Sequence, residues 1–98
     1  MQLSYEELPE YQFPYWFTYT TTPGSENFDH IMDTNEWCGQ QFGDLGVDWG
    51  YERKQDTSGA PQGLNPVRVR LHYTTVIYSW RFKNREAAMR FKLAWGGA

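Results

Sequence analysis

The stretch VIYSWRFKNREAAMRFKLAWGG, residues 76–97, decides how this chain ends and what its sheet packs against. Every second residue at its start is apolar: Val76, Tyr78, Trp80 and Phe82. This two-residue period is typical of a β-strand with one face in a core. The strand is therefore expected to supply a row of large side chains to the centre of the protein.

A helix follows directly in the same stretch. Asn84 is a favourable N-cap and Gly96-Gly97 a favourable stop, which together predict a helix from Arg85 to Trp95. Its packing face contains Ala87, Ala88, Phe91, Ala94 and Trp95. Met89 and Leu93 form a second apolar strip, so the helix has more apolar surface than one sheet contact requires. We expect it to contact a second layer or a second chain.

Residues 80–96 resemble the ending of a family of small, uncharacterised bacteriophage proteins, many of them from marine phages. The last strand and helix of that family read approximately F-x-F-K-N/D, three or four residues, then A-x-x-F-K-L-x-W-G. The matching residues here are Phe82, Lys83, Asn84, Ala88, Phe91, Lys92, Leu93, Trp95 and Gly96. The resemblance implies a phage or metagenomic source, a shared fold, and a location in the cytoplasm of an infected bacterium or in the virion. It implies no particular activity.

The first half of the chain predicts one strand and one helix. Residues 1–14 are acidic and interrupted by prolines, which is typical of an extended arm. Residues 15–22 are aromatic and β-branched and predict a strand. Ser25 as the N-cap and Gly43 as the stop predict a helix over residues 26–42. One arc of that helix is expected to be buried, and contains Phe28, Ile31, Met32, Asn35, Cys38 and Phe42.

Trp37 is the exception to this arc, because it lies about 180° from Phe28 on the helical wheel. If the helix is unbroken, the large indole ring faces either solvent or a second layer. The other interpretation is a break at Asp33-Thr34-Asn35 that resets the register of the helix.

The second half of the chain predicts two strands before the last helix. Residues 47–54 alternate with period two and have a charged outer face, whereas residues 55–66 are rich in Gly, Pro and Ser and predict a flexible loop. Residues 67–83 contain no breaker, but the parity of their apolar positions switches near residues 72–75, which predicts a bulge or bend. The elements together predict a single α+β domain. We expect a β-α-β-β-α sandwich with two helices on one face of an antiparallel sheet, an incomplete ferredoxin-like arrangement.

Charge is distributed unequally along the chain. Residues 1–50 contain nine carboxylates and no Lys or Arg, giving 0 − 9 = −9. Residues 51–98 contain all nine Lys and Arg and three carboxylates, giving 9 − 3 = +6 and a total of −3. Such asymmetry either pulls the two halves together in one fold or marks a charged surface for a partner. Opposite charges on one chain also suit self-association.

Few residues offer catalytic or metal-binding chemistry. Cys38 is the only cysteine, and with His30 or His72 it is the only candidate for nucleophilic catalysis. Its place on the apolar arc predicts an inert, buried thiol. Two histidines and one cysteine in different elements lack the spacing of metal ligands, and no glycine-rich phosphate-binding motif is present. The sequence therefore predicts a protein that is not an enzyme and binds no cofactor.

Single-stranded nucleic acid is the alternative ligand that the second half suggests. Arg68 and Arg70 share one strand face, and Tyr78 and Trp80 are candidate platforms for stacking bases. The acidic composition of the whole chain, with a pI of about 5.2, argues against this class of ligand.

The leading hypothesis is a non-enzymatic interaction or accessory protein that binds a protein partner or a second copy of itself. The residues expected to contact a partner are Trp37, Arg68, Arg70, Tyr78, Trp80, Met89 and Leu93. No apolar run approaches the roughly 18–20 residues of a membrane span, and the N-terminal residues lack the features of a signal peptide. With one cysteine, the composition predicts a soluble chain in a reducing compartment.

Overall fold

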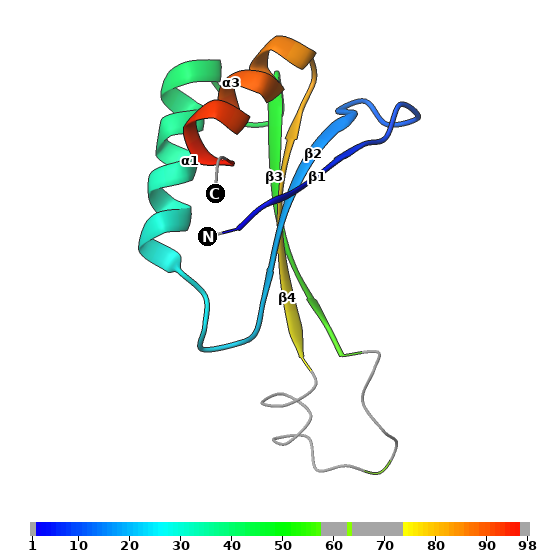
Figure 1. Cartoon of the computed structure of the whole chain (residues 1–98), viewed down its shortest axis with the longest axis vertical. Helices are drawn as coiled ribbons and strands as arrows, with labels where there is room; N and C mark the ends of the chain where they lie inside the picture. The colour runs from blue at the N-terminus through cyan, green and yellow to red at the C-terminus, as the bar shows by residue number, and fades with distance from the viewer. Residues whose placement is uncertain (1, 58–62, 64–73, 97–98) are drawn as a thin grey trace.

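The computed structural model describes residues 2–57, 63 and 74–96 (Figure 1). Its strands and helices, in chain order, are β1 (Ser4–Glu7), β2 (Tyr15–Thr21), α1 (Phe28–Phe42), β3 (Trp49–Asp56), β4 (Thr75–Phe82) and α3 (Arg85–Trp95). All pairings between the strands are antiparallel. Both helices lie on the same side of this sheet (Figure 1). The predicted α+β class, the β-α-β-β-α order and the position of the helices are therefore confirmed.

The strand order in the sheet is β1-β2-β4-β3. Strand β4 lies between β2 and β3, so the β2-α1-β3 unit is split by a third strand, as in ferredoxin-like folds. The prediction left one edge of this arrangement empty. Strand β1 fills that edge, and Tyr5 lies opposite Phe17 of β2. The acidic arm predicted at residues 1–14 thus contributes a short strand to the sheet.

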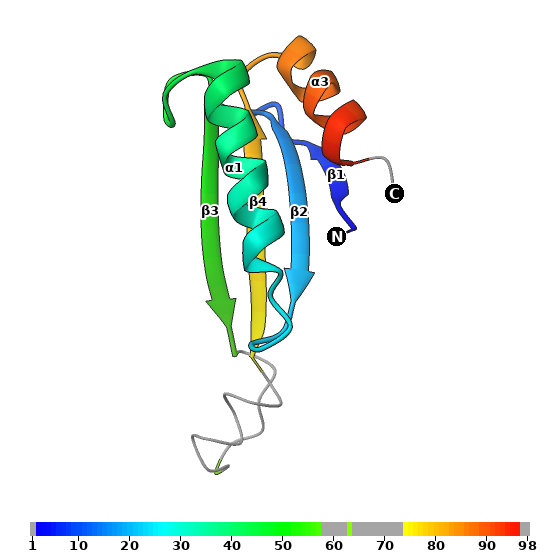
Figure 2. The ribbon, with the colours of Figure 1, turned by 90° about the vertical axis from the view of Figure 1, so that its left-hand side faces the viewer.

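Helix α1 lies across one face of the sheet (Figure 2), and the buried aromatic side chains of the strands pack in the core on that side. The alternation predicted for β4 is confirmed, because Val76, Tyr78, Trp80 and Phe82 are all at most 1% exposed. Phe17 of β2 lies opposite Trp80, and Trp49 of β3 lies opposite Phe82, so the same face continues across three strands. Burying such rings supplies most of the hydrophobic stabilisation of a small domain.

Helix α3 forms as predicted. The Asn84 side chain accepts a hydrogen bond from the Ala87 backbone N–H at 2.8 Å, which caps the first turn. Ala87, Ala88 and Phe91 are buried, and the small alanines allow the helix to approach the sheet closely. Trp95 is half-buried, whereas Ala94 is exposed.

Helix α1 ends at the predicted Gly43, whose φ of 86° favours glycine, but its other details differ from the prediction. Its N-cap is Asn27 and not Ser25. The buried side chains of the helix are Ile31, Thr34 and Cys38. Phe28 and Met32, expected in the core, are 57% and 67% exposed. The helix sits on the sheet through a face rotated away from the arc of largest apolar residues.

The break proposed at Asp33-Thr34-Asn35 is wrong, because α1 is continuous through these residues. Thr34 is fully buried with its polar group satisfied, since its hydroxyl donates to the His30 carbonyl at 2.7 Å. The Asn35 side chain accepts a hydrogen bond from Trp80 Nε1 at 2.7 Å and ties the helix to β4. Polar residues in mid-helix therefore hold α1 to the sheet.

The end of the third strand differs from the expectation. Strand β3 continues through residues 55–56, which were predicted to begin a loop. Most of that loop, the upstream part of the predicted strand at residues 67–73, and most of its predicted bend lie outside the described residues.

Candidate interaction surfaces

Two of the predicted contact residues belong to the core. Tyr78 is 1% exposed and Trp80 is fully buried, so neither ring is available to stack on a base or anchor a partner. Their rings stack on one another at 6.3 Å between centroids, and Trp80 also packs at 6.0 Å from Phe91. Arg68 and Arg70 lie outside the described residues.

Trp37 occupies the second layer that one of the alternatives predicted. Its half-buried ring lies at the seam between the two helices, 6.1 Å from the Trp95 ring and 6.3 Å from the Phe91 ring. A third ring, that of Phe42, meets it edge-on at 5.6 Å. Trp37 therefore holds α1 and α3 together, and only part of its surface is available to a partner.

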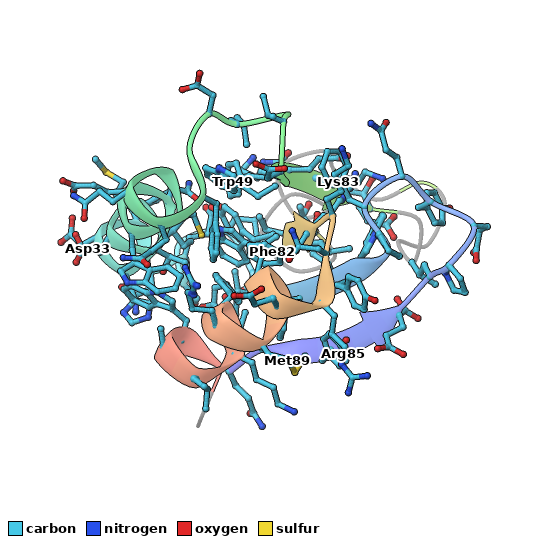
Figure 3. The ribbon with its side chains drawn as sticks, turned by 90° about the horizontal axis from the view of Figure 1, so that it is seen from above. Asp33, Trp49, Phe82, Lys83, Arg85 and Met89 are labelled. Atoms are coloured by element: carbon cyan, nitrogen blue, oxygen red, sulfur yellow. The ribbon has the colours of Figure 1, made fainter. Side chains whose placement is uncertain are left out.

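The outer face of α3 combines apolar and basic side chains. Leu93 is 88% exposed, and Met89, one helical turn earlier, is half-buried. Three exposed cations flank this pair: Arg85, Arg90 and Lys92. Viewed from above, Arg85 points away from the core (Figure 3), whereas half-buried Met89 also packs against the edge of the core. This surface, the basic face, contains two of the predicted contact residues, Met89 and Leu93.

The outer face of α1 has the opposite charge. Exposed Phe28 and Met32 are one turn apart, and the acidic residues Asp29, Asp33 and Glu36 share that side of the helix. Asp33 points away from the sheet (Figure 3). We call this surface the acidic face. The helical wheel did not indicate this surface, because it placed Phe28 and Met32 on the arc expected to be buried.

These two faces remain charged because internal ion pairs do not neutralise them. Of the ion pairs in which both residues are described, only Glu26–Arg53, at 2.8 Å, joins the acidic half to the basic half. On the basic face, Arg90 has a neighbour in Glu86, at 3.4 Å on the exposed surface. Exposed ion pairs of this kind contribute little to the stability of the fold. Among the described residues, most of the opposite charges of the two halves therefore lie on the surface and are not paired with each other inside the fold.

Glu26 forms a buried polar cluster with Arg53 and Tyr78 beneath the start of α1. The Glu26 side chain is 6% exposed and accepts hydrogen bonds from the Tyr78 hydroxyl and from Arg53 Nε, the latter at 2.9 Å. Burial alone would raise the pKa of Glu26, but these two donors hold it below its usual value. Burial and the negative charge of Glu26 raise the pKa of Tyr78. The carboxylate is thus ionised and the phenol neutral at pH 7.

Replacing Glu26 with glutamine is expected to lower the free energy of unfolding by about 1–2 kcal/mol at pH 7, because charged hydrogen bonds are lost from a buried site. The folded pKa of Glu26 is lowered, so its stabilisation is present above about pH 4.5 and disappears as pH falls through that folded pKa. Urea unfolding at pH 7 and pH 3 measures both effects. The exposed Glu86→Gln variant is the control, with less than about 0.5 kcal/mol expected. Equal effects of the two variants at pH 7 would contradict the assignment.

On the sheet face away from the helices, charged and aromatic side chains contact one another. The Arg81 guanidinium lies 3.9 Å from the centroid of the Trp16 ring, and Tyr11 lies 5.2 Å from the same ring. Glu52 pairs with Arg81 at 2.5 Å and with Lys54 at 3.3 Å. Arg81 and Lys54 are therefore neutralised by Glu52, and the Trp16 ring is partly covered.

The chemistry available in the described part of the chain is limited. Cys38 is fully buried, and burial raises the pKa of its thiol to about 12, so it is protonated at neutral pH. No group of three His, Cys, Asp or Glu side chains in the described ranges could hold a metal ion. A hollow of about 320 Å³ lies between the β1–β2 connection and the start of α3, lined by Glu7, Pro9, Pro14, Tyr15 and Arg85. It contains one carboxylate and one guanidinium but no nucleophile paired with a base.

Comparison with known proteins adds no relative to this description. No protein-family model, no curated protein and no solved structure matches the chain. Neither described helix is long and apolar enough to cross a membrane. The two charged helix faces are therefore the candidate interaction surfaces of this chain.

Proposed function

We propose that this chain is a non-enzymatic interaction module that binds protein partners through the outer faces of α1 and α3. The observation that carries the proposal is Leu93, which is 88% exposed on a regular helix beside half-buried Met89. An exposed leucine alone is ordinary. Here it belongs to an apolar strip with charges around it, the composition of a protein–protein contact with an apolar centre and a polar rim.

Single-stranded nucleic acid binding has less support as an alternative. Its proposed stacking residues, Tyr78 and Trp80, are in the core, and the cation Arg81 is paired with Glu52. The remaining basic residues on α3 would still attract phosphates at low salt. The C-terminal resemblance to phage proteins supports a place of action in an infected bacterium or its virions, and this location is part of the proposal.

A photo-crosslinking amino acid placed at position 93 tests the proposal directly. We expect it to form adducts with protein when the chain is expressed in bacterial cells and irradiated. The control position is Thr20, which is exposed on the uncovered face of the sheet and should form few adducts. Adducts to nucleic acid instead of protein, or equal yields at the two positions, would contradict the proposal. The mass of the adduct also identifies the kind of partner.

A further inference from the structure

We infer that the partner is a second copy of this chain, and that the acidic face of one copy docks on the basic face of the other. The inference rests on the proposed function and names the occupant of the same surfaces. Charge complementarity between the two faces is the observation that favours a second copy over an unrelated protein.

The acidic face offers one sign of charge only. Helix α1 contains Asp29, Asp33 and Glu36 and no Lys or Arg. These carboxylates are exposed, and none forms an ion pair with a described residue. They lie at spacings of four and three residues and therefore share a side of the helix, which adjoins the exposed Phe28 and Met32 on one flank of that apolar pair. In an isolated domain, three like charges repel one another here, and two apolar side chains beside them are exposed to water.

The basic face has an apolar pair of the same spacing, with cations on both of its flanks. Met89 and Leu93 are four residues apart, as are Phe28 and Met32, so the two apolar pairs have the same length along their helices. Arg85 and Lys92 lie on one side of the apolar strip, and Arg90 lies on the other. Two helices packed with these faces together would put apolar side chains at the centre and opposite charges at the rim.

One copy can use both faces at once. Asp33 and Arg85 point outward in different directions when the molecule is seen from above (Figure 3). The contact joins two different surfaces of the same chain. It closes as a dimer when each copy uses both faces on its neighbour, and it otherwise builds a ring or an open chain. In each case association should weaken with salt, because the rim charges are screened.

Paired charge reversals test the inference. The first variant reverses the acidic face (D29K/D33K/E36K) and the second reverses the basic face (R85E/R90E/K92E). Each alone would set like charges against each other, so its self-association constant should fall about tenfold or more. An equimolar mixture should restore association, because each variant then meets a complementary face on the other. A matched control, E6K/E10K/D44K, changes net charge as much as the first variant does and should associate like the wild type.

Analytical ultracentrifugation over a range of concentration and salt measures the wild type, the three variants and the mixture, and circular dichroism confirms that each variant is folded. A wild type that stays monomeric at millimolar concentration would overturn the inference. So would a mixture of the two reversals that stays monomeric, or a control that loses association. A monomeric wild type that still forms adducts of other masses from position 93 would leave the proposed function standing. Absence of both association and adducts would remove both proposals.

Discussion

Replacing Phe91 with alanine is expected to lower the free energy of unfolding by about 3–5 kcal/mol, the usual cost of removing a buried aromatic ring. Phe91 is fully buried at the point where α3 meets the sheet. Its ring lies 4.9 Å from those of both Phe17 and Phe82, so the truncation would leave a cavity lined by rigid aromatic groups. A loss of this size is a large part of the roughly 5–15 kcal/mol that stabilises a domain.

The control for this prediction lies two residues away on the same helix. Leu93→Ala removes a similar apolar side chain from a position that is 88% exposed, and should change stability by less than about 0.5 kcal/mol. Chemical denaturation of the two variants, at a protein concentration where the wild type is monomeric, gives the comparison. A loss above about 2 kcal/mol for Leu93→Ala would show that this residue is part of the core, and would remove the basic face from the functional argument.

Alkaline pH is expected to destabilise the protein strongly through Cys38. Burial raises the pKa of this thiol from 9.0 to about 12. The stabilisation is therefore complete below pH 9 and is lost as pH rises toward 12, since the unfolded chain releases the proton first. Three pKa units correspond to about 4 kcal/mol. Burial and the neighbouring Glu7 also raise the pKa of Tyr5 to about 12, which adds to the loss above pH 10.

The Cys38→Ala variant isolates the contribution of the thiol. It should be less stable than the wild type at pH 7, but its free energy of unfolding should fall less steeply between pH 9 and pH 12. Thiol labelling provides an independent measurement, because a fully buried Cys38 should react only when the chain opens. Rapid labelling of the folded protein at pH 8, or equal pH slopes for the two proteins, would contradict the burial of this group.

The elements predicted most accurately are those in which local chemistry and packing agree. In β4 and α3, the alternation of apolar residues, the Asn84 cap and the buried alanines all favour the observed structure. The split arrangement of β2, α1 and β3 also follows from the order of elements. Strand β1 could not be predicted with the same methods, because a four-residue acidic segment becomes a strand only when a neighbouring edge supplies its hydrogen bonds.

Helix α1 shows why the candidate site could be predicted only in part. A helical wheel groups residues by hydrophobicity, whereas the burial of a residue depends on where the helix lies on the sheet. Thr34 is buried because its hydroxyl is satisfied within the helix, and Met32 is exposed because no described element covers its side. The apolar strip of α3 was identified from its sequence, since the helix had two apolar faces and one sheet to cover.

Local patterns were thus sufficient for the class of fold and for its last strand and helix, because periodicity and capping depend on residues a few positions apart. The separation of charge along the chain follows directly from the composition of its two halves. Long-range packing decided the rest. It placed Tyr78 and Trp80 under α1 and Trp37 between the helices, and it left one charged face on each helix uncovered. Those outcomes depend on contacts between side chains that are distant in sequence and adjacent in space. Such contacts form only when the chain folds.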